Sequence, residues 1–197
     1  MVIIKRITTI LIALLLFSLL VVGCSSQQTE DKKLKLGYVQ WSSAEASTYL
    51  MEEVLERAGY DVKRMTVQAG AMYQGLAEGD LDAMVCAWLP KTHKSYWEQY
   101  GENLVDLGAN YQGAKIGLTV PGYVDVNSIA ELKNNAQKFN QRIIGVDPGA
   151  GIMQITDNKA MQEYGLKDWT LVESSGPAMT AKLKAAIEDK KPVVVTG

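Results

Sequence analysis

Cysteine and histidine are scarce in this chain of 197 residues, which contains only Cys24, Cys86 and His93 of these two types. Sites for zinc and similar metals are usually built from several such ligands, so no metal site is expected. If Cys24 carries a lipid, as argued below, one cysteine remains and no internal disulfide can form. Cys86 lies in the apolar run LDAMVCA (81–87), where it is most simply a small buried hydrophobic residue.

An excess of positive charge is also lacking. Lysine and arginine number 20 against 22 aspartates and glutamates, which gives a formal net charge of -2. Removal of an N-terminal segment with Lys5 and Arg6 would bring the charge to -4. A mildly acidic chain offers no basic surface for a phosphate backbone, so nucleic acid is not expected as a partner.

The N-terminus has the pattern of a secretory signal. Two basic residues precede the apolar run Ile7–Val22, and small residues lead to Cys24. A transmembrane helix is the alternative, but the apolar run is short for a span of ~20 residues. Residues 1–23 are therefore interpreted as a bacterial lipoprotein signal peptide, Cys24 as the lipidated residue and 24–33 as a polar tether. This predicts an extracytoplasmic protein that is lipid-anchored to the cell membrane.

Strand and helix patterns alternate through the first half of the remaining chain. The expected strands and the helices between them are strand 34–40, helix 44–58, strand 60–67, helix 71–77 and strand 81–87. Gly59 is placed to end the first helix. This β-α-β-α-β order is typical of a parallel sheet covered by helices.

The alternation continues in the second half. We expect strands over 114–120, 142–146, 170–172 and 192–196. A surface helix is expected over 94–100, and a second helix should run from the capping-box sequence Ser128–Glu131 towards Phe139. A third helix should follow the glycine-rich turn and end at Tyr164, and a fourth should span 178–189. Two α/β lobes follow, 34–120 and an incomplete 121–197. Because VVVTG (193–197) reads as a central strand without a polar tail, the chain is expected to be C-terminally truncated.

Two tryptophans follow predicted strands. Trp41 comes directly after 34–40 and Trp88 directly after 81–87. Parallel strands end at the same edge of a sheet, so both indoles could face one crevice and form a cage for a quaternary ammonium group. Core packing is the alternative for each, and it is the interpretation adopted for Trp97 and Trp169.

Two further features suit a carboxylate. His93 lies five residues after Trp88, and an imidazole can donate a hydrogen bond to a carboxylate; a structural role or a helix cap is the alternative. The turn GVDPGAGIM (145–153) stands between a strand and a helix, where free backbone N–H groups suit an anion. Its glycine spacing is that of neither a dinucleotide fingerprint nor a P-loop, and a purely structural turn is the alternative.

Together these phrases resemble the glycine betaine/proline betaine-binding proteins of bacterial ABC importers, the quaternary-amine substrate-binding family. The similarity runs over essentially all of 35–197. The phrases that carry it are GYVQW (37–41), AGAMYQGLAEGDLDA (69–83), AWLPKTH (87–93), GLTVP (117–121), GVDPGAGIM (145–153), YGLKDWTL (164–171) and KPVVVTG (191–197).

The resemblance implies a two-lobed periplasmic-binding-protein fold of type II that closes on its ligand. By motif, Trp41 and Trp88 match cage tryptophans, His93 matches the carboxylate-binding histidine, and Gly151 and Ile152 match the backbone amide donors. A third cage tryptophan is expected directly after Gly197. The implied partners are a betaine ligand and the permease and ATPase subunits of an ABC transporter, with osmoprotective uptake as the role, no cofactor and no catalysis.

Other functions stay open at this level. A choline, carnitine or amino-acid binder would keep the fold and change the ligand. An extracellular hydrolase would use Cys86 and His93 as nucleophile and base. A structural or sensory lipoprotein would bind no ligand.

Overall fold

The computed structural model describes residues 32–197. The expected signal peptide and Cys24 lie outside the described residues, as does most of the expected tether. Lys33–Gly197 forms one compact unit. Over residues 32–197, no helix combines the length and the apolar composition that a membrane span requires.

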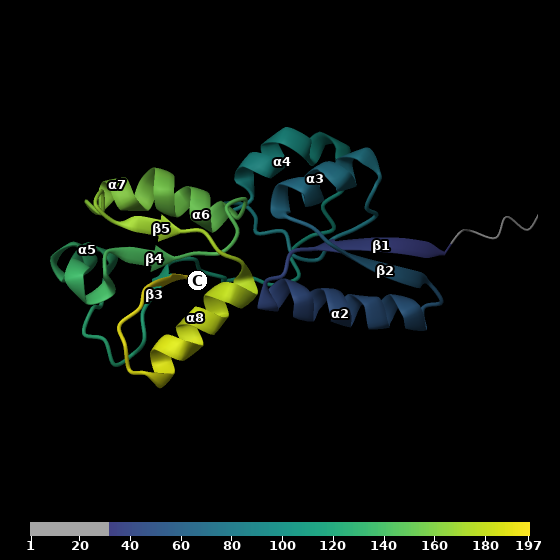
Figure 1. Cartoon of the computed structure of the whole chain (residues 1–197). Helices are drawn as coiled ribbons and strands as arrows, with labels where there is room; N and C mark the ends of the chain where they lie inside the picture. Colours follow the sequence, from purple (N-terminus) through teal and green to yellow (C-terminus); the bar gives the residue numbers. More distant parts are fainter. Residues whose placement is uncertain (1–31) are drawn as a thin grey trace, which may run out of the picture. The chain divides into compact units, whose positions relative to one another are not determined.

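The first half of the unit is built on a short parallel sheet. β1 (Lys33–Tyr38) pairs along its whole length with β2 (Asp61–Thr66). α2 (Ser42–Arg57) lies on one face of these strands, and α3 (Ala69–Glu78) and α4 (Lys94–Tyr100) lie on the other (Figure 1). The sequence prediction of these five elements is confirmed to within a few residues, and for α4 at both ends.

Glycine ends both longer helices of this half. Gly59 follows α2 with φ 88°, and Gly79 caps α3 with φ 80°. These left-handed conformations favour glycine because a side chain would be strained there. The expected cap at Gly59 is thereby confirmed.

The strand predicted over 81–87 is wrong in extent. The segment makes one parallel bridge, between Leu36 and Ala83, with the Gly37 N–H donating to the Ala83 carbonyl at 2.9 Å. Two residues before Gly37, the Lys35 N–H donates to the Asp82 carboxylate at 2.7 Å and not to a backbone carbonyl. A side chain that takes a backbone N–H away from the hydrogen bonds between strands interrupts the pairing. Residues 81–87 therefore lie beside β1 without forming a third strand.

The second half contains a four-stranded mixed sheet with the order β3-β6-β4-β5. Its strands are β3 (Leu118–Thr119), β4 (Arg142–Ile144), β5 (Thr170–Val172) and β6 (Val195–Thr196). β3 runs antiparallel to β6, and the other pairs are parallel. The prediction of β5 is confirmed, whereas the other three strands are shorter than expected.

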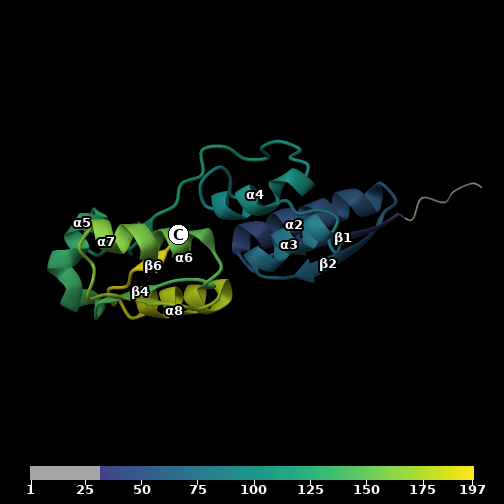
Figure 2. The same ribbon diagram turned by 90° about the horizontal axis from the view of Figure 1, so that it is seen from above.

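The connection between the two sheets bears on the lobe boundary, which was expected after residue 120. A segment without helix or strand, residues 104–117, leads to β3 (Figure 2). β3 then pairs with β6 in the second sheet. The boundary remains a prediction, and we propose that the second lobe begins before Leu118.

The helices of the second half are more broken than the sequence pattern suggests. They are α5 (Ile129–Leu132), the 3-10 helix η2 (Lys133–Phe139), α6 (Gly151–Ile155), the π-turn η3 (Thr156–Ala160), α7 (Met161–Glu163) and α8 (Gly176–Glu188). α6 and α7 lie on one face of the sheet and α8 on the other (Figure 1). The expected single helix from Ser128 to Phe139 is therefore wrong beyond Leu132.

The capping-box residues interact as their spacing predicts only in part. The Glu131 carboxylate accepts from the Asn127 N–H at 3.0 Å and from the Ser128 hydroxyl at 3.0 Å. Ser128 is the N-cap but its side chain bonds to Glu131 and not to a helix N–H. The expected bond from a helix N–H to the Ser128 hydroxyl is therefore not formed.

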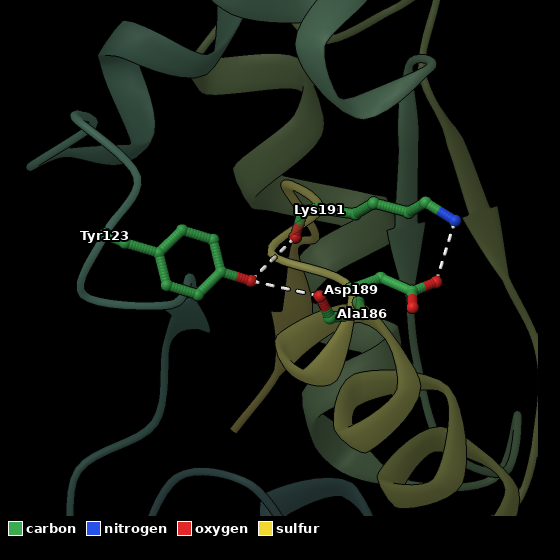
Figure 3. A network of polar contacts seen from close by, with 4 residues as sticks. All are labelled: Tyr123, Ala186, Asp189 and Lys191. Atoms are coloured by element: carbon green, nitrogen blue, oxygen red, sulfur yellow. Dashed lines mark hydrogen bonds and ion pairs between the residues drawn. The ribbon is translucent and has the colours of Figure 1, made fainter.

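Tyr123 anchors the C-terminal end of α8 (Figure 3). Its hydroxyl lies 3.2 Å from the Ala186 carbonyl and 2.8 Å from the Lys191 carbonyl, and these oxygens can share it as acceptors. Asp189 and Lys191 form an exposed ion pair beside it, at 2.8 Å. The far end of α8 is thereby held against the loop that follows β3, which helps to fix the position of its N-terminus.

Three clusters of buried side chains hold the unit together. The largest lies in the second half and consists of Val126, Leu132, Phe139, Ile143, Met161, Leu166, Trp169 and Val194. Trp169 is 6% exposed, and its ring centroid lies 5.9 Å from that of Phe139. Trp97 packs against the cluster formed around α3. The prediction that both tryptophans serve packing is confirmed.

Substitution of Trp169 by alanine should therefore destabilise the protein strongly. Loss of a large buried ring typically costs ~3–5 kcal/mol because the surrounding core cannot close the cavity. Urea unfolding measures this difference. Leu50→Ala is the control: Leu50 is 66% exposed on α2, so its removal should change stability by less than about 0.5 kcal/mol. Equal effects of the two substitutions would contradict this assignment of the core.

Candidate functional site

A cavity of about 650 Å³ lies where the ends of the two sheets approach each other. All five residues predicted from the sequence line it: Trp41, Trp88, His93, Gly151 and Ile152. The first three come from the β1 half, and the last two come from α6 in the second half. The wall is mostly apolar, which is typical of small-molecule sites that hold a ligand with a few placed polar groups.

Trp41 is held at the junction between β1 and α2. It is the N-cap residue of α2, in an extended backbone conformation, and its carbonyl accepts the first helical hydrogen bond from Glu45 at 2.8 Å. Its indole Nε1–H donates to Asp147 Oδ2 at 2.9 Å. The ring centroids of Trp41 and His93 are 5.9 Å apart. One edge of the indole is thus fixed by a hydrogen bond and one face lies near the imidazole.

Trp88 is fixed through Cys86. Its indole Nε1–H donates to Cys86 Sγ at 3.1 Å. Burial raises the pKa of the Cys86 thiol, so the sulfur stays protonated near neutral pH. A nucleophilic thiolate, which the hydrolase hypothesis requires, is disfavoured by this environment. Cys86 is half-buried and supports the orientation of Trp88.

His93 is fully buried beside these rings. Its Nδ1 accepts a hydrogen bond from the Trp88 backbone N–H at 3.1 Å and lies 3.2 Å from the Tyr73 hydroxyl. Because a backbone N–H can only donate, Nδ1 carries no proton in the neutral ring and Nε2 does. Nε2 is buried and has no hydrogen-bond partner among residues 32–197. An N–H donor is therefore available beside the cavity.

The charge of His93 follows from its burial. Desolvation lowers the pKa of the imidazole to about 4, from an ordinary value of 6.5. At neutral pH the ring is uncharged, and its tautomer is set by the Trp88 amide. The residue can offer one hydrogen bond without a formal positive charge.

Gly151 and Ile152 open α6. Ala150 is the N-cap residue, so the N–H groups of Gly151 and Ile152 belong to the first helical turn and have no partner in the helix. A Cβ on Gly151 would overlap the carbonyl group of Thr92. The turn before α6 therefore packs backbone to backbone on the segment that carries His93.

Residues of α8 also line the cavity, and the sequence analysis assigned them no role. Gly176, Pro177, Met179 and Thr180 come from its first turns. A Cβ on Gly176 would overlap the Gln40 carbonyl, so α8 and α2 begin side by side (Figure 1). The signal was present, because Ser175 caps a helix with proline in its first turn, shortly after the end of β5.

Two α/β halves, each with its own sheet, and a ligand-sized cavity lined by residues of both define a bilobal substrate-binding protein. The family model described as "Substrate binding domain of ABC-type glycine betaine transport system" matches residues 32–197, and the chain belongs to this family. The predicted fold class, a two-lobed type II periplasmic-binding-protein fold, is confirmed by this match and by the solved structures below.

Among curated proteins, the chain is 39% identical over 110 residues to the glycine betaine/carnitine transport binding protein GbuC of Listeria monocytogenes. That alignment covers 55% of this chain and 37% of the relative. The chain therefore aligns with little more than a third of this relative.

Solved structures give a broader match. Lactococcal OpuAC, in a closed conformation complexed with glycine betaine, is 44% identical with a TM-score of 0.78; the match covers 85% of this chain and 65% of that one. The glycine/betaine/L-proline-binding protein ProX of Borrelia burgdorferi is 40% identical with a TM-score of 0.78, over 84% and 62% of the two chains. A choline-binding protein complexed with choline, at 24% identity and a TM-score of 0.76, shares the fold.

The buried neutral imidazole predicts how stability depends on pH. Between pH 6.5 and about 4 the histidine of the unfolded chain takes up a proton that buried His93 does not. Stability should therefore fall as pH falls through this window, by roughly 2–3 kcal/mol from this residue at pH 4.5. Urea unfolding at pH 7 and pH 4.5 should show a smaller loss in His93→Asn than in the wild type. An equal loss in both would contradict a lowered pKa.

The contact at Gly151 predicts a contrast between neighbouring glycines. Gly151→Ala should lower the free energy of unfolding by ~1–3 kcal/mol, because backbone must move to admit the methyl group. Gly149→Ala is the matched control: its Cβ would lie 3.7 Å from the Tyr96 hydroxyl, an ordinary contact distance. Urea unfolding of both variants measures the difference, and a tolerated alanine at 151 would refute the close packing on Thr92.

Proposed function

We propose that this protein captures glycine betaine, or a related quaternary ammonium solute, outside the cell and delivers it to the permease of an ABC importer. The observation that carries the proposal is the composition of one cavity wall. Two indoles lie around the same space as the neutral N–H donor of His93, which has no partner among the described residues. A zwitterion with a soft cation at one end and a carboxylate at the other matches these groups.

The cationic end is assigned to Trp41 and Trp88. A trimethylammonium group spreads its charge over methyl groups and holds water weakly, so an aromatic face can replace its hydration. Each desolvated cation–π contact is worth ~2 kcal/mol. Both indole N–H groups already have acceptors, Asp147 and Cys86, which helps to keep the ring orientations fixed.

The carboxylate end is assigned to His93, Gly151 and Ile152. The imidazole Nε2–H and the two backbone N–H groups are donors without charge. A hydrogen bond to a charged group contributes about 1.5–3 kcal/mol, which exceeds that of a bond between neutral groups. These donors come from both halves of the unit, and a carboxylate between them would bridge the halves.

The relatives support this assignment by what their names state. The Listeria protein is named for glycine betaine and carnitine, and the lactococcal structure holds glycine betaine. Delivery to permease and ATPase subunits, osmoprotective uptake, and attachment to the cell membrane through lipid on Cys24 complete the proposal. The proposed role requires no catalytic group and no cofactor.

A titration of the purified protein with glycine betaine tests the proposal. Intrinsic tryptophan fluorescence should change on addition of the ligand, and calorimetry should detect heat. Trp97→Phe is the matched control for Trp41→Phe, because Trp97 packs in a core and not at the cavity. The change should persist in Trp97→Phe and diminish in Trp41→Phe. The absence of both a fluorescence change and heat in the wild type would refute the proposed function.

The same titration distinguishes betaine from choline. Choline lacks a carboxylate and gains little from His93, so His93→Asn should weaken betaine binding by about tenfold or more and leave choline nearly unchanged. Carnitine, which has a carboxylate, should follow betaine. A wild type that prefers choline and an equal loss for both ligands would favour the choline-binding alternative.

A further inference from the structure

We propose that Asp147 is a positioning residue for the quaternary-ammonium cage: it fixes the indole of Trp41 from the opposite half of the unit and raises the electron density of that ring. This inference rests on the proposed function, since it concerns the same cavity. It adds a residue that contacts the cage tryptophan and not the ligand.

The hydrogen bond of Asp147 joins distant parts of the chain. Trp41 follows β1, and Asp147 follows β4, 106 positions later. Asp147 Oδ2 accepts from the indole Nε1–H at 2.9 Å, and the residue is 7% exposed. The orientation of Trp41 is therefore determined by the second sheet as well as by its own helix. A cage wall carried by one half is aligned by a side chain of the other.

The side chain is not needed to build its own turn. The turn before α6 closes through the backbone carbonyl of Asp147, which accepts from the Ala150 N–H at 3.0 Å. Its second carboxylate oxygen, Oδ1, is buried and has no partner among the described residues. A buried polar atom without a partner destabilises the folded state. A purely structural acceptor for one indole N–H would not require this second oxygen or a charge.

A carboxylate holds and polarises an indole more strongly than a neutral acceptor does. A charge-assisted hydrogen bond is roughly twice as strong as a neutral one and holds the ring more firmly. It also polarises the indole, which makes the ring face more negative and more attractive to a cation. The aspartate lies at the ring edge, so its charge acts on the cage without occupying the space of the ligand.

Two substitutions separate orientation from charge. Asp147→Ala removes the acceptor and the charge, whereas Asp147→Asn keeps an acceptor oxygen and a similar volume. Asp157→Ala is the control, since Asp157 is an exposed residue of the same half. The first measurement is the indole N–H region of a 1H–15N NMR spectrum of the unliganded protein. The chain has four tryptophans, and Trp41→Phe assigns the Trp41 signal.

We expect Asp147→Ala to shift the Trp41 indole signal upfield and to speed its exchange with solvent, while the other three signals and Asp157→Ala stay at wild-type positions. The shift in Asp147→Asn should be smaller. Glycine betaine affinity, measured by calorimetry, should fall by about tenfold in the alanine variant and by a smaller factor in the asparagine variant.

The outcomes separate this inference from the proposed function. A wild type that binds no betaine overturns the proposed function. A wild type that binds, with Asp147→Ala at wild-type affinity, overturns the role of Asp147 alone. If the alanine variant does not fold, Asp147→Asn decides: an unmoved Trp41 signal and wild-type affinity overturn the inference, and a shifted signal with weaker binding supports it.

Discussion

The hydrogen bond from the Trp88 backbone N–H to His93 Nδ1 determines most of the chemistry of the cavity. The bond assigns the proton of the neutral ring to Nε2, the atom that has no partner in the part of the chain that the structure describes. It also joins two residues with different proposed roles, because the backbone of a cage tryptophan orients the carboxylate donor. Burial completes the effect by lowering the pKa of the imidazole to about 4, which keeps the donor neutral.

The cavity depends equally on close approach between backbones. Gly151 lies against the Thr92 carbonyl, and Gly176 lies against the Gln40 carbonyl. Both glycines begin helices of the second half, and both neighbours belong to the first. A side chain at either position would separate the two halves, since a carbonyl group on the main chain cannot turn aside as a long side chain can. These two backbone contacts therefore set how closely the two halves approach each other on either side of the cavity.

The position of the site was predictable because strand ends are local features of a sequence. Trp41 and Trp88 each follow an apolar run, and the cavity includes both even though only the first run forms a full strand. Parallel segments end at a common edge of a sheet. The single parallel bridge at Ala83 is enough to show that residues 81–87 run in the same direction as β1. The error over 81–87 therefore left the placement of Trp88 unaffected.

Other features depended on contacts that no local pattern encodes. The pairing of β3 with β6 joins residues almost eighty positions apart, so the sequence near Leu118 does not say which sheet it enters. The acceptor for the Trp41 indole is likewise far along the chain, at Asp147. The break after Leu132 arises where a 3-10 helix follows directly, a change of winding that the apolar spacing of the segment did not predict.

The uncharged state of His93 has a consequence in concentrated salt. Mobile ions weaken attraction between exposed charges, and at 1 M ionic strength that attraction fades within about 3 Å. A buried imidazole N–H, backbone amides and indole faces act on a ligand at contact range and carry no net charge that mobile ions could screen. For a zwitterion held by such groups, dissolved electrolyte competes poorly. Binding of such a ligand at high salt would then follow from the uncharged groups that line the cavity, and no other part of the chain would need to change.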